Sequence, residues 1–269
     1  MHRRDLAGSE KVLGPEHPYT LVSVSNLGSV LAGQGKYEEA EAMHRRALQG
    51  REKVLGPEHP DTLVSVSNLG SVLADQGKYE EAEAMHRRGL AGSEKVLGPE
   101  NPDTLTNMSK LGSVLADQGK YEEAELMHRQ ALQGREKVLG PAHPDTLTSM
   151  ANLANVYVNQ GRLVKAEELE VQVLKSRKRM LGPEHPATLA SMHNLAFTWN
   201  ELGSLPDAFN LLKECADLRN KVLGADHPHA ALSSSMLLSW EMAADQLSES
   251  YTQQASAHFY SSPGSRLCG

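Results

Sequence analysis

Apolar residues recur along the chain at the spacing of α-helices, and they come in pairs of segments. In residues 55–96 the first apolar stripe lies on one predicted helix face and consists of Leu63, Val66, Leu69 and Leu73. A second stripe follows and comprises Tyr79, Ala82, Met85 or His86, Leu90 and Val96-Leu97. Pro60 marks the start of the first helix. Gly77 and Gly98 mark the two helix ends, because glycine adopts left-handed backbone without steric cost. The pattern predicts two antiparallel helices.

This helix pair returns at a fixed interval. The phrase Leu-Gly-Pro-Glu-His-Pro begins at Leu13 and recurs every 42 residues. Its later copies, some of them with substitutions, start at Leu55, Leu97, Leu139, Leu181 and Leu223. A strict period of this length is typical of a solenoid, in which each unit packs on its neighbours and no single globular core exists. Such arrays present extended surfaces, and binding is their usual function.

The repeat predicts the organisation of the whole chain. We expect five 42-residue units over residues 15–224. Residues 1–14 align with the segments that start at Met43 and Met85, so they predict the second helix of an incomplete repeat, either as a frayed cap or because the chain is a fragment or short isoform of a longer protein. Residues 225–260 predict a degenerate capping repeat, and residues 261–269 a flexible tail. An incomplete repeat leaves part of its apolar stripe uncovered, so self-association through it is a further expectation.

The repeated residues resemble a known family. Leu69-Gly70, Gly77-x-Tyr79 and Ala82 match the tetratricopeptide pattern, and the closing "EKVLG…HP" phrase resembles the long repeat of kinesin light chains. The resemblance covers about residues 1–230 and implies an all-α, right-handed superhelical solenoid whose first helices line a concave groove. Related arrays also form the C-terminal sensor part of NB-ARC and NACHT-type ATPases.

The first two units are nearly identical. They differ only at Tyr19/Asp61, Gly33/Asp75, Ala47/Gly89, Gln49/Ala91 and Arg51/Ser93. Glycines also recur inside the predicted second helices, at Gly50, Gly89, Gly92 and Gly134. Because each helical glycine costs about 1 kcal/mol relative to alanine, the early units are expected to be softer than the later ones.

Composition and charge exclude several partners and compartments. The net charge is −7, and basic residues are scattered without forming the stripe that nucleic-acid binding requires. No apolar run approaches the roughly 20 residues of a transmembrane helix. Two cysteines, Cys215 and Cys268, form no disulfide framework. Neither nucleic acid nor membrane is an expected partner, and a cytoplasmic location fits these features.

The histidines and serines point to structure rather than to chemistry. One histidine set precedes proline in the loops and comprises His17, His59, His143, His185 and His227. A second set falls in the second helices and comprises His2, His44, His86 and His128. Members of a set are one repeat apart, so they cannot form a metal shell within one unit. Neither a Gly-x-Ser-x-Gly nucleophile motif nor a phosphate-binding loop occurs. We therefore predict no enzyme activity, no metal site and no cofactor.

The predicted binding surface is the concave groove. In the family, the residue before the conserved leucine often is an asparagine that faces the groove, and here this register reads Asn26, Asn68, Lys110, Asn152 and Asn194. By resemblance, these residues would hold the backbone of a peptide; alternatively, they hydrogen-bond a neighbouring helix. Other candidate groove residues of the later units are Asn155, His193 and Phe197.

The function predicted from these features is a non-catalytic adaptor that binds a peptide or helix of a partner protein. Lys110 would contact an acidic group of this ligand and Phe197 an apolar one. A different possibility is a sensor or self-association segment of a larger NB-ARC or NACHT-type ATPase. A third is a passive spacer or decayed gene fragment without a partner.

Overall fold

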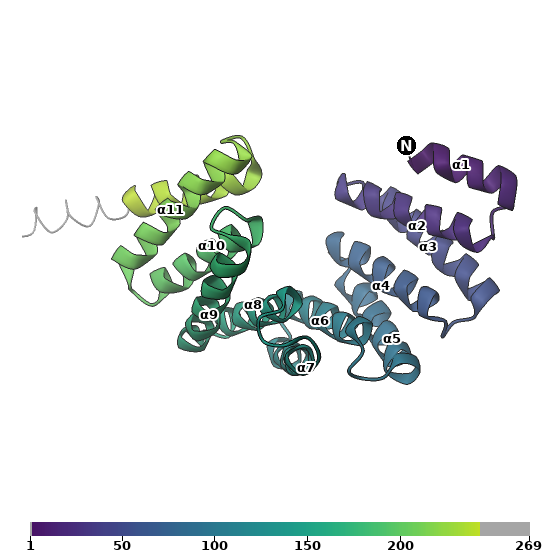
Figure 1. Ribbon diagram of the computed structural model, residues 1–269, viewed down its shortest axis with the longest axis horizontal. Coiled ribbons are helices and arrows are strands. Elements are labelled where there is room, and N and C mark those ends of the chain that lie inside the picture. Colours follow the sequence, from purple (N-terminus) through teal and green to yellow (C-terminus); the bar gives the residue numbers. More distant parts are fainter. Residues whose placement is uncertain (1, 243–269) are drawn as a thin grey trace, which may run out of the picture. The chain divides into compact units, whose positions relative to one another are not determined.

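The computed structural model describes residues 2–242 and shows only helices and connecting loops there, as the sequence predicted (Figure 1). The helices are α1 (His2–Leu13), α2 (Pro18–Gly33), α3 (Tyr37–Leu55), α4 (Pro60–Asp75), α5 (Tyr79–Leu97), α6 (Pro102–Asp117), α7 (Tyr121–Leu139), α8 (Pro144–Asn159), α9 (Leu163–Leu181), α10 (Pro186–Glu201) and α11 (Leu205–Leu223). A further helical stretch occupies 228–242. We number the helix pairs α2–α3 to α10–α11 as repeats 1 to 5.

The chain divides into two compact units, Met1–Leu169 and Glu170–Gly269, and α9 crosses their boundary. The first unit contains α1 to α8, and the second contains α10 and α11. Within each unit, consecutive helices pack against one another. The predicted boundaries at 1–14, 15–224, 225–260 and 261–269 stay a prediction, and residues 243–269, which include the end of the predicted cap and the whole predicted tail, lie outside the described residues.

Each first helix begins at a proline that follows a capping side chain. His59 Nδ1 accepts a hydrogen bond from the backbone N–H of Asp61 at 3.1 Å, and the Oδ1 atom of Asn101 accepts one from Asp103 at 2.9 Å. The same bond forms at His17, His143, His185 and His227. A helix N-terminus leaves backbone N–H groups without partners, and a side-chain acceptor at the N-cap satisfies one of them. The loop histidines are therefore helix caps, which explains why Asn101 can replace one.

The apolar stripe of the first helix is buried as predicted, but that of the second helix differs. In α4, the four leucine and valine residues of the predicted stripe are at most 4% exposed. In α5, Ala82 and His86 are buried, whereas Val96 is 43% exposed. Val96 was therefore wrongly assigned to the stripe. Gly89 and Ser93 continue the buried face instead, because they follow His86 by about one and two helical turns.

Glycines lie where the two helices of a repeat cross. A Cβ atom at Gly70 would be 2.8 Å from Cε1 of His86, and a Cβ atom at Gly92 would be 2.5 Å from Cδ2 of Leu63. Equivalent close approaches occur at Gly28, Gly112, Gly50 and Gly134. Gly50, Gly92 and Gly134 inside the second helices thus allow close packing, a benefit that their low helix propensity does not reveal. The expected softness of the early units stays a prediction.

Charged side chains of the second helices form ion pairs within and between repeats. Arg45 contacts Glu41 of its own helix at 2.7 Å and Glu81 of the next repeat at 3.2 Å. Glu41 also accepts a bond from Lys78, and this bond is the main reason why the pKa of Glu41 falls to about 2. Arg87 and Glu83 repeat this arrangement one unit later. The second helices thus carry a network of ion pairs that joins neighbouring repeats.

Candidate functional site

A column of polar side chains occupies the same position in successive first helices of the first unit. We call it the polar ladder, and its members are Asn26 on α2, Asn68 on α4, Lys110 on α6 and Asn152 on α8. Asn26 is exposed, and the other three are half-buried. Neighbouring first helices of this unit contact one another, so the ladder runs across three repeat junctions.

Hydrogen bonds join the ladder to buried serines of the preceding repeat. Asn68 Nδ2 donates to Ser25 Oγ at 3.5 Å, Lys110 Nζ to Ser67 Oγ at 3.0 Å, and Asn152 Nδ2 to Ser109 Oγ at 3.4 Å. The two asparagine bonds are long for N–H···O hydrogen bonds, and the lysine bond is of normal length. The alternative expectation, that this register bonds a neighbouring helix, is therefore borne out at Asn68, Lys110 and Asn152.

A ligand-binding role is compatible with these bonds. An asparagine side chain carries two N–H groups and a carbonyl oxygen. At Asn68 and Asn152, the bond to serine uses one N–H group. The carbonyl oxygen and the second N–H group are the atoms with which each side chain could bind a peptide backbone.

Lys110 is the cation of the ladder, and its environment is unusual for a lysine. Burial lowers the pKa of its ammonium group, while the nearby charge of Asp75 acts in the opposite direction. Asp75 in repeat 2 occupies the position that Gly33 has in repeat 1, so repeat 1 lacks this carboxylate. The Lys110 ammonium group thus donates to a buried serine hydroxyl and is attracted by the charge of Asp75.

A cavity of about 130 Å³ lies beside the ladder, between α4, α5 and α6. Ser67, Asn68 and Lys110 line the part that belongs to the ladder. Its remaining lining consists of Pro60, Leu63, Val64, Ser93, Leu97, Asp103, Thr106 and Asn107. The repeat pattern alone does not predict this cavity. The available signal was the replacement of Arg51 by Ser93 between otherwise nearly identical units.

The other predicted site residues lie apart from this cavity. Asn155 is exposed on α8, about one turn after Asn152. In the second unit, α10 carries His193, Asn194 and Phe197, of which Phe197 is 40% exposed and the other two are half-buried. His193 Nδ1 lies 3.2 Å from Ser233 Oγ. Burial, with smaller effects of the Arg219 and His229 charges, lowers the pKa of His193 to about 4.

The described residues contain neither a group of three metal-ligating side chains nor a helix that could span a membrane. Cys215 is buried in the core of the second unit, where its thiol donates to the carbonyl oxygen of Leu189 at 3.2 Å. Burial raises the pKa of this thiol, which disfavours the reactive thiolate. Cys268 lies outside the residues that the structure describes.

Comparison with known families agrees with the repeat length and the helix pairs. Models described as tetratricopeptide repeat match residues 2–49, 23–95, 64–137 and 103–179, and a further one matches residues 188–229. The chain belongs to the tetratricopeptide-repeat family. Arrays of this family typically serve as non-catalytic scaffolds for protein–protein interaction. No curated protein matches the chain.

Solved tetratricopeptide arrays have similar folds. A crystal structure from Podosopora anserina, described as nearly identical TPR-like repeats of kinesin light chain type, is 29% identical, with a TM-score of 0.65 over 76% of this chain and 97% of that one. BtubC (BKLC) from P. vanneervenii shares the fold at 18% identity, with a TM-score of 0.69 over 84% and 91% of the two chains. The apo form of the quorum sensor NprR from B. thuringiensis does so at 14% identity, with a TM-score of 0.66 over 88% and 63%. This chain is thus a tetratricopeptide array that is similar in fold to repeats described as kinesin light chain type.

Proposed function

We propose that this array is an adaptor that binds an extended peptide or a helix of a partner protein along its polar ladder. The observation that carries the proposal is the ladder itself, in which an asparagine or, on α6, a lysine recurs at every first helix of the first unit, and in which Asn68 and Lys110 border a cavity. A peptide backbone presents donors and acceptors at regular intervals, which such a column can pair. Serine–asparagine bonds hold the side chains in place and so reduce the entropy lost on binding.

Different parts of the ligand would meet different residues. In the first unit, Asn26, Asn68, Asn152 and Asn155 would bind the ligand backbone, and Lys110 would attract an acidic group. In the second unit, His193, Asn194 and Phe197 would provide a separate contact, with Phe197 as its apolar anchor because aromatic side chains dominate many interfaces.

Selection of ligands from a random peptide display library, followed by affinity measurement, tests the proposal. We expect the combined Asn68→Ala and Asn152→Ala variant to lose at least about tenfold in affinity for the selected peptides. Lys53→Ala with Lys95→Ala serves as the matched control, because both lysines lie in exposed ion pairs. Helicity of all variants would be compared by circular dichroism. Equal affinities of the ladder and control variants would overturn the proposed site.

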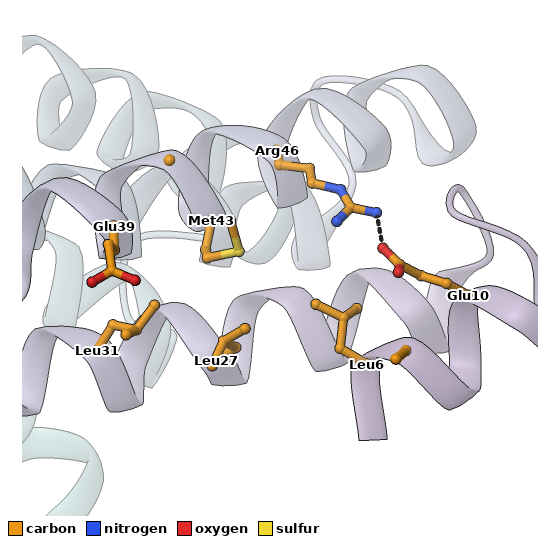
Figure 2. A pocket seen from close by; sticks show the side chains of 9 residues that line it. Leu6, Glu10, Leu27, Leu31, Glu39, Met43 and Arg46 are labelled. Carbon is orange, nitrogen blue, oxygen red and sulfur yellow. Dashed lines mark hydrogen bonds and ion pairs between the residues drawn. The ribbon is translucent and has the colours of Figure 1, made fainter. Parts of the chain in front are cut away.

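A cavity beside α1 favours a second role, self-association. Leu6 on α1 and Leu27, Leu31 and Met43 of repeat 1 line this space of about 360 Å³, and the ion pair of Glu10 with Arg46, at 2.5 Å, lies at its edge (Figure 2). Exposed apolar cavities of this kind accommodate side chains of another subunit. Light scattering of the native chain and a Met43→Glu variant tests this role. A concentration-dependent dimer that is lost in the variant is expected, and a monomer at all concentrations would contradict it.

A further inference from the structure

A buried arginine connects the second helix of one repeat to the helix that follows it at four junctions within the described residues. The arginines are Arg51, Arg135, Arg177 and Arg219, each at most 9% exposed. In each case the Nη1 atom donates to one backbone carbonyl and one serine hydroxyl of the following helix. Arg51 donates to Asp61 O (3.0 Å) and Ser65 Oγ (2.7 Å), and Arg135 to Asp145 O (3.3 Å) and Ser149 Oγ (2.7 Å). Arg177 donates to Ala187 O (3.2 Å) and Ser191 Oγ (2.9 Å), and Arg219 to His229 O (3.0 Å) and Ser233 Oγ (2.6 Å). The same guanidinium geometry thus occurs four times within this chain.

The junction between repeats 2 and 3 lacks this arginine. Ser93 occupies its position, and Asn107 occupies the position of the serine acceptor. Asn107 Nδ2 donates to Ser93 Oγ at 3.3 Å and to the carbonyl oxygen of Gly89 at 3.4 Å. This shorter pair does not fill the space of an arginine side chain, and the cavity of about 130 Å³ lies here, with Ser93 and Asn107 in its lining.

The groups that surround a guanidinium elsewhere are still present at this junction. Asp103 lines the cavity and corresponds to Asp61 and Asp145, whose charges attract Arg51 and Arg135. Its carbonyl oxygen corresponds to the backbone acceptors of these arginines. Asn107 Oδ1 is a further acceptor in the place of the serine hydroxyl. The cavity therefore retains a carboxylate and neutral oxygen acceptors, which suit the planar, five-donor guanidinium fork.

We propose that this cavity receives the arginine side chain of a bound peptide, whose guanidinium takes the place of the arginine that Ser93 replaces. The proposal deepens the proposed peptide-binding function and rests on it, because Ser67, Asn68 and Lys110 belong both to the ladder and to the cavity lining. The chain thus supplies four of these arginines itself and takes one from its ligand.

Lys110 also lines this cavity, so the site contains a positive charge as well. Lys110 follows Asp103 by two helical turns of α6, or roughly 10 Å along the helix axis. Its ammonium group donates to Ser67 on α4. A ligand arginine beside Asp103 therefore leaves room for an acidic ligand residue beside Lys110. In an extended peptide at about 3.3 Å per residue, the two would be about three positions apart.

Two exchange variants test the proposal with little risk to folding, because each copies a junction that the chain already has. Ser93→Arg with Asn107→Ser gives the junction between repeats 2 and 3 the Arg51–Ser65 arrangement and fills the cavity. Arg51→Ser with Ser65→Asn does the reverse and opens a cavity between repeats 1 and 2. The probe is N-acetyl-arginine amide, and saturation-transfer NMR on the full chain detects its binding. N-acetyl-citrulline amide is the uncharged control.

We expect saturation transfer to the arginine probe in the native chain, a loss of at least about threefold in the filled variant, and a gain in the opened variant. Citrulline amide should give no comparable signal. An equal signal from the native and filled chains, or none from the native chain, would overturn the proposal. Circular dichroism of each variant verifies that the fold is retained.

Peptides selected by display separate this proposal from the proposed function. The expected result is enrichment of arginine over lysine at one position, with an acidic residue about three positions away, and loss of this preference in the filled variant. Peptides that need Asn68 and Asn152 but show no arginine preference would overturn the arginine site and leave the peptide-binding function standing. Binding of the arginine probe without any selected peptide would overturn the peptide-binding function and leave the arginine site standing.

Discussion

Repeats 1 to 3 and repeat 5 build the same helix crossing from different side chains. In the early repeats, a glycine of the first helix lies against a buried histidine of the second, as with Gly70 and His86. Repeat 5 has Ala196 and Leu212 at these positions, and both belong to its apolar core. The first helix carries the smaller glycine where the second carries histidine, and the larger alanine where the second carries leucine. The two side chains at a crossing thus differ in size in a compensating way, while the polarity of the crossing changes.

The early crossings should make stability depend on pH. Burial lowers the pKa of His86 and His128 to about 4 from the usual 6.5, and it lowers the pKa of His44 in the same direction. The Nδ1 atoms of these three histidines have no hydrogen-bond partner. Because the folded pKa lies below the unfolded one, the unfolded chain binds more protons between pH 6.5 and 4. The stability present above pH 6.5 is therefore lost as the pH falls through this window.

The largest predicted effect is this loss of stability on acidification. At about 1.36 kcal/mol per pKa unit, His86 and His128 would each contribute on the order of 3 kcal/mol between pH 6.5 and 4. Hydrogen exchange of repeats 2 and 3, corrected for intrinsic rates, measures the effect. His193 gives repeat 5 a contribution of the same sign, so the comparison requires a substitution. The Gly70→Ala, His86→Leu variant should show a smaller pH dependence in repeat 2, and an unchanged profile would contradict the assignment.

Next in size is the cost of placing a methyl group at one of these crossings. Gly70→Ala alone should destabilise the protein by about 1–3 kcal/mol through overpacking against the His86 ring, despite its higher helix propensity. Combined with His86→Leu, it copies the Ala196–Leu212 pair of repeat 5. A double-mutant cycle in urea should give a favourable coupling of at least about 0.5 kcal/mol. Additive losses would mean that the two residues do not form one packing unit.

A smaller effect is expected at the second crossing, where Gly92 lies against Leu63. Repeat 5 has Leu218 in place of Gly92, packed against the core that contains Leu189. Gly92→Ala gains about 1 kcal/mol of helix propensity. Its methyl group meets the end of a flexible leucine side chain, which can shift. We expect a net change within about 1 kcal/mol, measured by urea unfolding. A loss as large as that of Gly70→Ala would show that Leu63 cannot move.

The sequence predicted the elements of the fold better than their contacts. The period, the prolines and the apolar stripe of α4 specified each first helix, because these signals depend on local geometry alone. The buried face of α5 was partly wrong, since Val96 is apolar but lies outside the crossing, while Gly89 and Ser93 lie within it. Burial there depends on which side chains the neighbouring helix presents.

The candidate site shows the same division. The ladder residues could be placed in register from the repeat, but their bonds to serines of the preceding repeat depend on how repeats stack. The cavity between repeats 2 and 3 depends on two exchanges, Ser93 and Asn107, whose side chains meet only after folding. The replacement of Arg51 by Ser93 was visible in the sequence. That it leaves a cavity becomes clear only from the position of Asn107 in the folded chain.

The smallest predicted effect concerns a feature that does not differ between the two regions. Lys53 pairs with Glu16 in repeat 1 and Lys221 with Glu184 in repeat 5, each at 2.5 Å, and the lysine side chains are 65% and 68% exposed. Exposed ion pairs contribute little because water and salt screen them. Lys53→Ala and Lys221→Ala should each change the free energy of unfolding by less than about 0.5 kcal/mol, and equally so, in urea titrations at low and high salt. A larger loss for Lys53→Ala alone would mean that the early repeats depend on their surface charges. Equal small losses would mean that these surface ion pairs do not distinguish the two regions.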